Sequence, residues 1–67
     1  MKKFLINLIN QHSRNRTHVQ NIDRFMDSDR FKALPLVERK LMAKHSATMH
    51  ELDAILSERL RIHGIEV

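Results

Sequence analysis

The fold of this chain is decided by residues 35–64, PLVERKLMAKHSATMHELDAILSERLRIHG. Proline suits the first turn of a helix, glycine suits the position just after the last turn, and no helix breaker lies between them here. The stretch therefore predicts one long helix over residues 35–63, about 43 Å in length at ~1.5 Å per residue. We expect this helix to pack along the first segment of the chain and against neighbouring chains.

The predicted long helix carries an apolar stripe close to heptad spacing. Its members are Leu41, Met42, His45, Met49, Leu52, Ile55, Leu56 and Leu60. His45 is polar but stands in the middle of the stripe. We therefore predict that His45 is buried and fixes the register between helices.

The first segment of the chain also has helical periodicity, but with a polar interruption. His12 and Asn15 fill two positions of a stripe whose other members are Leu5, Leu8, Val19, Ile22 and Met26. No apolar residue lies in the run 10–16. The segment is either one long helix with a hydrophilic middle, or a short helix over residues 2–10 that meets a second helix over about 15–27; we favour the bend.

The segment between the two helical regions has the features of a hairpin corner. Ser28 and Asp29 supply oxygens that cap a helix, and Pro35 disfavours α geometry at Leu34 while it favours the start of a new helix. The composition, with one glycine, one proline and 42% apolar residues, is typical of helices. We therefore predict one all-α domain over residues 1–67, an antiparallel helical hairpin with a short N-terminal helix or bend.

Self-association is expected because the chain is small. A core of this size supplies only about 3–5 kcal/mol before disulfides, metals or oligomerisation are counted. The chain has no cysteine, and two amphipathic helices leave one apolar side bare. Ile62, Ile65 and Val67 extend the apolar character further. These features predict a homo-oligomer.

The net charge of +4 is placed entirely in the first segment. Residues 1–16 contain no acidic residue, and the other eight basic residues of the chain balance its eight acidic ones. The basic residues of this segment are Lys2, Lys3, Arg14 and Arg16. The asymmetry indicates either an anionic partner for the first segment or charges that only keep the terminus soluble.

The opening residues, MKKFLINLIN, resemble a secretory signal only superficially. Their apolar part, residues 4–9, is interrupted by Asn7, and no small-residue cleavage site follows it. No stretch approaches the ~20 apolar residues that a membrane span needs. We expect a protein of the cytoplasm without a membrane partner.

Neither a metal site nor a catalytic group is predicted. The histidines include no pair spaced by three or four residues, so no two are neighbours on a helix face; they are His12, His18, His45, His50 and His63. Ser13 adjoins His12 in the sequence, but adjacent helical positions diverge by about 100°. Asp27 and Asp29 flank Ser28, where capping explains them. We expect a binding protein without a cofactor, not an enzyme.

Two motifs follow one another within residues 28–60. Residues 31–42 read FKALPLVERKLM, and the second motif consists of Met49, Leu52, Ile55, Leu56, Arg59 and Leu60. The two are similar to F-x-x-L-P-x-x-E-x-x-L-L-x-x-Q and M-x-x-Y-x-x-[IL]-L-x-x-R-[IL], a pattern of the phage anti-CBASS cyclic-nucleotide sponges. The chain departs from the pattern at His45, where the family has glutamine, and at Leu52, where it has tyrosine.

This resemblance implies both a fold and a ligand. Proteins of the sponge family block a bacterial defence because they bind its cyclic oligonucleotide messengers without cleaving them. The resemblance implies a compact homo-oligomer, typically a hexamer. It also implies that cyclic dinucleotides lie between subunits and that cyclic trinucleotides occupy a separate site on the symmetry axis. Such a protein acts in the cytoplasm of the host cell.

The candidate ligand-binding residues come first from the run 10–16, which combines positive charge, amide groups and no apolar residue. We predict that Arg14 and Arg16 bind the anionic ligand and that His12 offers a stacking surface. Because the run has no apolar residue, we also predict that none of it packs in a core.

Further candidates lie near the ends of the predicted helices. Lys3 belongs to the basic first segment. Arg59 or Arg61, in the last turns of the long helix, is predicted to serve a second anionic site, although the helix dipole also favours cations there.

Two other functional classes remain open. One is an oligomeric protein-interaction module, such as a phage inhibitor of a host protein, and the other is a nucleic-acid binder driven by the N-terminal charges. With only three phenylalanines as aromatic residues, the chain offers few stacking groups for a nucleic acid.

Overall fold

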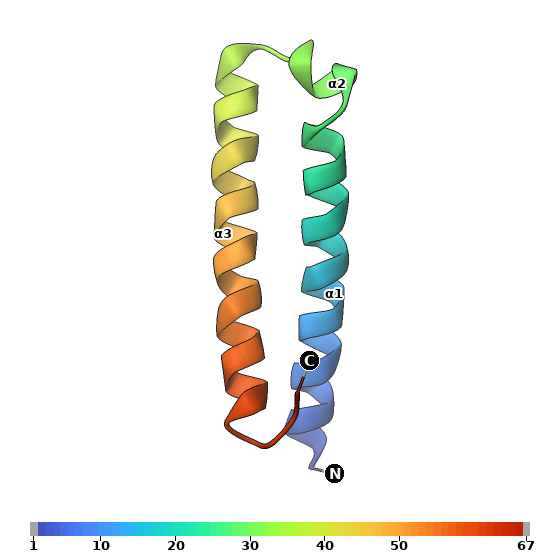
Figure 1. Cartoon of the computed structure of the whole chain (residues 1–67), viewed down its shortest axis with the longest axis vertical. Helices are drawn as coiled ribbons and strands as arrows, with labels where there is room; N and C mark the ends of the chain where they lie inside the picture. The colour runs from blue at the N-terminus through green and yellow to red at the C-terminus, as the bar shows by residue number, and fades with distance from the viewer. Residues whose placement is uncertain (1, 67) are drawn as a thin grey trace.

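The computed structural model describes residues 2–66 and shows two long antiparallel helices joined by a short one (Figure 1). Helix α1 spans Lys3–Met26, α2 spans Asp29–Lys32 and α3 spans Leu36–Arg61. The described residues contain no strand. The all-α helical hairpin predicted from the sequence is therefore confirmed.

Helix α1 is continuous over its 24 residues, so the predicted bend at residues 10–16 is wrong. The prediction took the polar residues of that run as an interruption of the apolar stripe. In the structure His12 and Asn15 are buried against α3 and continue the packed face. Neither glycine nor proline occurs in the segment, so nothing in its backbone favours a break.

The corner of the hairpin is built as its sequence predicts. The Ser28 hydroxyl caps α2 by accepting a hydrogen bond from the Phe31 N–H at 3.3 Å. Phe25 and Phe31 meet edge to face with ring centroids 6.3 Å apart, which ties α2 to the end of α1. Pro35 stands just before α3, and the Arg39 guanidinium donates to the Leu34 carbonyl at 3.0 Å. These contacts reverse the chain direction within a few residues.

At the other end of the hairpin, Gly64 terminates α3 as predicted. Its φ of 78° lies in the left-handed region that L side chains rarely adopt. The Ile65 N–H bonds the Leu60 carbonyl and the Gly64 N–H bonds the Arg61 carbonyl, which is the Schellman pattern. The reversal turns Ile65 back onto the core.

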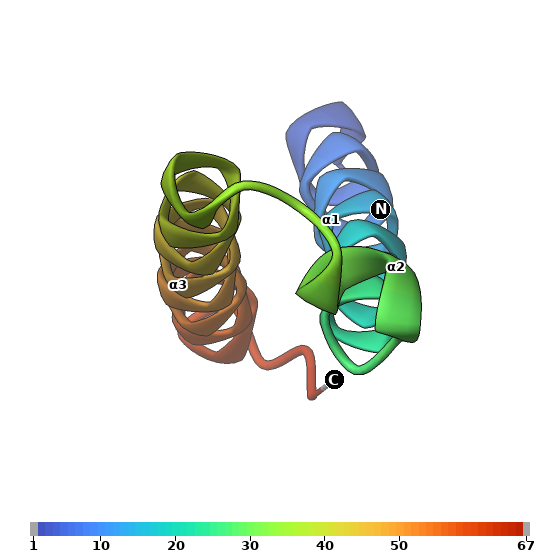
Figure 2. The same ribbon diagram turned by 90° about the horizontal axis from the view of Figure 1, so that it is seen from above.

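The hydrophobic core is a thin line between α1 and α3, which lie side by side while α2 covers only the end of α1 (Figure 2). The buried apolar side chains within residues 2–66 are Leu8, Val19, Leu56 and Leu60. Much apolar surface of α3 stays in water, on Leu36, Val37, Leu41, Leu52 and Ile55, and Ile62 just after the helix is exposed as well. Val67, the last member of the predicted apolar C-terminus, lies outside the described residues.

The prediction that His45 is buried and sets the register is wrong, because His45 is exposed and its neighbour Ser46 is buried instead. The cause lies in the spacing of the stripe. Two sets of residues on α3 are each spaced by three and four. The set that includes Leu41 and His45 faces away from α1, and the set that includes Met42 and Ser46 faces toward α1.

Within residues 2–66, every helix is too short or too polar to cross a lipid bilayer.

Replacing Gly64 with alanine should lower the free energy of unfolding by about 1 kcal/mol. An added Cβ would meet no neighbour within 4 Å, so the cost comes from the left-handed backbone alone. Asparagine tolerates this conformation better, so Gly64→Asn should lose less than Gly64→Ala. Urea unfolding followed by circular dichroism at one protein concentration measures the difference. Equal losses for the two variants would contradict the backbone explanation.

Candidate ligand-binding site

Polar side chains bridge α1 and α3 along much of their contact, and we call this set of contacts the polar seam. Its members are His12, Asn15, Arg16 and Asp23 on α1 and Ser46, His50, Asp53 and Ser57 on α3. The Met49 carbonyl is a further acceptor. A buried polar group must find a partner, so the contacts of the buried members His12, Asn15 and Ser46 favour one alignment of the two helices.

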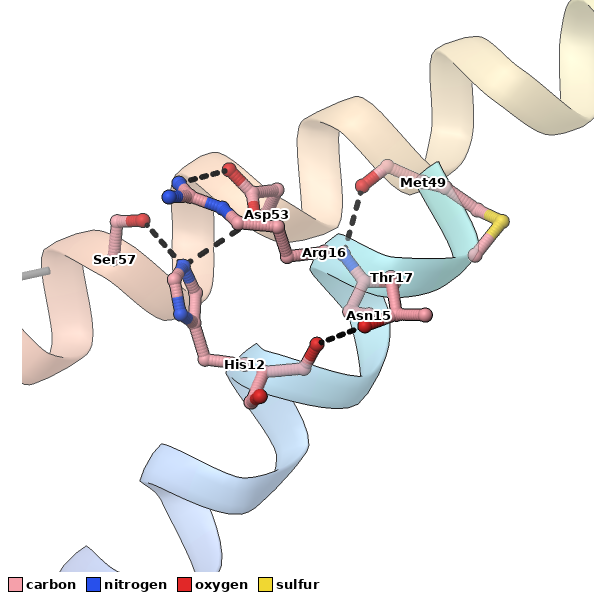
Figure 3. Close-up of polar contacts among 8 residues, drawn as sticks. His12, Asn15, Arg16, Thr17, Met49, Asp53 and Ser57 are labelled. Carbon is pink, nitrogen blue, oxygen red and sulfur yellow. Dashed lines mark hydrogen bonds and ion pairs between the residues drawn. The ribbon is translucent and has the colours of Figure 1, made fainter. Parts of the chain in front are cut away.

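The centre of the polar seam is His12, which is only 4% exposed (Figure 3). Its Nε2 lies 2.9 Å from the Ser57 hydroxyl and 3.3 Å from Oδ1 of Asp53. Arg16 approaches the other Asp53 oxygen at 3.4 Å. Which of Nε2 and the Ser57 hydroxyl donates in their hydrogen bond depends on the tautomer of the His12 ring.

This cluster does not have the geometry of a catalytic triad. In a triad the serine and the acid bind opposite nitrogens of the histidine ring, so that the acid orients the ring while the serine gives up its proton. Here Ser57 and Asp53 both lie at Nε2. Oδ1 of Asp53 is buried without a hydrogen bond of good geometry. The arrangement therefore differs from a triad, and its contacts join α1 to α3.

A second bridge lies one turn further along α1. The Asn15 side-chain amide donates to the Met49 carbonyl at 3.0 Å, as Figure 3 shows. This carbonyl also accepts the α-helical bond of its own helix, and a carbonyl oxygen has lone pairs for both. Asn15 therefore contributes a directional hydrogen bond at a position in the helix contact where an apolar side chain would contribute only packing.

The third bridge involves Asp23, which lies closer to the corner of the hairpin. Its carboxylate accepts hydrogen bonds from the Ser46 hydroxyl at 2.8 Å and from Nε2 of His50 at 2.7 Å. The bond from Ser46, followed by that from His50, lowers the pKa of Asp23 below its usual value of 3.8. The bridge is therefore strongest when the carboxylate is ionised.

The side of α1 that faces away from α3 has a different chemistry. Exposed residues at helical spacing of three and four form this outer face: Lys3, Asn7, Asn10, Arg14, Thr17 and Asn21. No aspartate or glutamate occurs in the chain before Asp23. The outer face therefore presents ammonium, guanidinium, amide and hydroxyl groups without a competing carboxylate on the same part of the helix. Such groups suit an anion that also has hydrogen-bonding edges.

The predicted site residues fall into three groups in the structure. Lys3 and Arg14 lie on the outer face of α1, and neither forms an ion pair with another described residue. His12 and Arg16 contact Asp53 across the polar seam. The burial of His12 and Asn15 shows that the prediction of no packing role for residues 10–16 is wrong.

The third group, Arg59 and Arg61, lies at the end of α3 that is near the start of α1 (Figure 1). Arg61 forms an ion pair with Glu58, and the hydrogen bond within this pair raises the pKa of Arg61 above its usual value. A shallow hollow of about 270 Å³ beside it is lined by Ala54, Ser57, Glu58, Arg61 and Glu66. Two carboxylates around one guanidinium make this hollow a poor site for a phosphate in the single chain.

Sequence reasoning missed the residues of α3 that hold the seam, above all Asp53 and Ser57. A signal for them exists in the sequence, because they lie four and eight residues after Met49 and alternate with Leu56 and Leu60 along one side of α3.

Among residues 2–66, no group of three or more histidine, aspartate and glutamate side chains is placed to hold a metal ion. No protein-family model, curated protein or solved structure is significantly similar to this chain.

Replacing His12 with leucine should lower the free energy of unfolding by about 1–3 kcal/mol, because Asp53 would face an apolar group. Adding Asp53→Asn should restore part of the loss, since a neutral amide is less costly to bury than a carboxylate. The matched control is His18→Leu, at an exposed position of α1. Urea unfolding at fixed protein concentration measures all three. A His12→Leu variant as stable as its parent would contradict the proposed role of the seam.

The contribution of Asp23 to stability should depend on pH. Its pKa is lower in the folded than in the unfolded chain, so the contribution is complete above about pH 3.8 and is lost as the pH falls below that value. The difference in urea midpoint between the parent protein and Asp23→Asn should therefore shrink as the pH is lowered from 5 to 2. Asp27→Asn, at an exposed position without a seam contact, is the control. A constant difference would rule out this linkage.

Proposed function

We propose that this protein is the subunit of a homo-oligomer that sequesters cyclic oligonucleotide messengers without cleaving them. The observation that carries the proposal is the outer face of α1, where Lys3 and Arg14 stand among amide and hydroxyl groups with no carboxylate before Asp23. The similarity of residues 28–60 to the phage anti-CBASS sponges supports the choice of ligand. In this proposal the protein acts in the cytoplasm of the host cell and protects a phage from its defence.

The chemistry of the outer face matches the chemistry of such a ligand. A cyclic dinucleotide has two phosphates and two bases, so it needs cationic groups as well as side chains that can hydrogen-bond base edges. Lys3 and Arg14 offer the first, and Asn7 and Asn10 offer the second. Phe4 is half exposed and packs edge to face on His63, which leaves part of its ring free for stacking close to Lys3.

The ligand is proposed to lie between subunits because one chain does not enclose it. The outer face is the convex side of a single helix, and the hollow near Arg61 contains two carboxylates. Apposed subunits would supply donors from two sides, as a ring-shaped ligand with two phosphates requires. Binding without turnover is supported by the seam, where Ser57 and Asp53 share one nitrogen of His12.

A second candidate is a protein-interaction module, and the exposed apolar residues of α3 favour it. Val37, Leu41 and Ile55 are all at least half exposed, which would suit another protein's helix. A nucleic-acid binder is less well supported. The outer face of α1 has only two cationic side chains, and a long polyanion usually meets more.

The ligand itself can be detected without a label. The protein has neither tryptophan nor tyrosine, so it absorbs little at 280 nm and bound nucleotide dominates the absorbance at 260 nm. The purified protein is mixed with cyclic dinucleotides or trinucleotides and passed through gel filtration. Co-elution of 260 nm absorbance, with intact nucleotide released on denaturation, supports the proposal. Linearised nucleotide would contradict the non-cleaving function, and no co-elution with either class would contradict the sponge.

Replacing Lys3 or Arg14 with alanine should weaken cyclic nucleotide binding by roughly ten- to hundredfold. A charge-assisted hydrogen bond contributes about 1.5–3 kcal/mol, and that loss corresponds to this change in affinity. Arg59→Ala should weaken binding at a second site, so it should affect cyclic dinucleotides and trinucleotides differently. Arg30→Ala, on the exposed side of α2 at the other end, is the matched control. Calorimetry measures each variant after its oligomeric mass has been checked. Binding unchanged in all three site variants would show that the site assignment is wrong.

A further inference from the structure

Most of the large exposed apolar residues of α3 lie along one face, which we call the outer stripe. It consists of Val37, Leu41, Thr48, Leu52, Ile55 and Ile62. Neighbouring members are three, four or seven residues apart, so they share one side of the helix. Val37 is 69% exposed and Leu41 is 61% exposed. The polar member, Thr48, donates its hydroxyl to the Lys44 carbonyl at 2.9 Å, so its hydrogen bond is made within α3.

The outer stripe is separate from the contact with α1. Met42, Met49 and Leu56 each follow a member of the stripe by one residue and lie toward α1, where they are at least partly buried. The spacing continues for about 37 Å, from Val37 in α3 to Ile62 directly after its last residue, at ~1.5 Å per residue. A face of this length and spacing is suited to a second helix. The structure thus leaves α3 with a helix partner on one side and an unpartnered apolar face beside it.

Charged residues border the outer stripe on the side away from α1. In the first half of α3 they are Lys40 and Lys44, and in the second half they are Glu51 and Glu58. All four are exposed. Glu58 also contacts Arg61 of its own helix, but this pair is exposed and free to exchange partners. The border is therefore basic at one end and acidic at the other, while Arg59 stands on the stripe itself at the acidic end.

This order of charges along α3 favours pairing with a second copy of the same helix in the antiparallel direction. We propose that the outer stripe of α3 pairs antiparallel with the outer stripe of a second copy of this chain, with the twofold axis near Thr48. Lys40 and Lys44 then lie opposite Glu58 and Glu51 of the partner subunit, and the same contacts recur on the other half of the axis. A parallel pair would instead gather all the lysines at one end and all the glutamates at the other.

The apolar residues fit the same arrangement. With the axis at Thr48, Leu41 lies at the level of Ile55 of the partner subunit, because the two residues are equally distant from the axis. Arg59 lies on the same side of the helix, so the pairing brings a candidate ligand-binding guanidinium to the boundary between subunits. The inference gives the oligomer of the proposed function a defined interface, but the pairing itself does not require a nucleotide.

Charge reversal tests the pairing and its direction together. One variant combines Lys40→Glu with Lys44→Glu, and the other combines Glu51→Lys with Glu58→Lys. Each variant alone should repel its own copy and show a lower mass than the parent protein by light scattering. An equimolar mixture should recover the parent mass, because the two borders again carry opposite charges. The inference is overturned if both variants keep the parent mass, if the mixture does not recover it, or if the parent protein is itself an 8.0 kDa monomer.

Cysteine cross-linking provides a test that does not depend on charge. The chain has no cysteine, so a single introduced thiol reports only its own surroundings. Thr48→Cys should form a disulfide-linked dimer on mild oxidation because the axis passes close to it. Ala43→Cys, on the opposite side of α3, is the control and should cross-link much less. Equal cross-linking of the two would overturn the interface. Both experiments are done without nucleotide, and gel filtration with cyclic dinucleotide is run separately, so a failed interface and a failed sponge function give different results.

Discussion

Two helices can bury only one side of each other, and most features of this protein follow from that constraint. The contact between α1 and α3 encloses few apolar side chains, and buried polar groups take up much of the rest of it. Within residues 2–66 no third element covers the remaining faces, since α2 reaches only the end of α1 (Figure 2). The outer face of α1 and the outer stripe of α3 are therefore both free for contacts outside the single subunit. The first is polar and basic and the second is apolar, so they suit different partners.

The polar seam contributes less hydrophobic stabilisation than an apolar contact would, but its hydrogen bonds define the alignment of α1 and α3. A line of leucines would tolerate a shift of one helix against the other, whereas Asn15 and His12 have hydrogen-bond partners in the observed alignment. This is also why the sequence predicted a bend where α1 is straight. Periodicity treats a polar residue on an apolar stripe as an interruption. Its role becomes visible only when the partner on the other helix, such as Asp53, is known.

Helix α3 shows which parts of a fold single-sequence reasoning can reach. Pro35 and Gly64 are local signals, and the helix limits that they predict are close to the observed ones. The apolar pattern of α3 is different, because which of its residues are buried depends on where the other helix lies. The predicted stripe merged two faces, one with Leu56 that packs on α1 and one with Leu41 that stays exposed. Because both faces are apolar, the sequence alone does not reveal which contact is internal. The basic character of the first segment was likewise readable from composition, while its division between the outer face and the seam required the structure.

The three bridges of the polar seam also imply an order of folding. They join residues that are 23, 34 and 45 positions apart, from Asp23–Ser46 near the corner, through Asn15–Met49, to His12–Ser57 toward the open end. Closing a loop costs more entropy as the loop lengthens, and each bridge that forms shortens the loop left for the next. The contact between α1 and α3 should therefore form progressively, from the corner of the hairpin toward its open end. Its open end, with Leu8 and Leu60, should be the last part to form and the first to exchange its amide hydrogens.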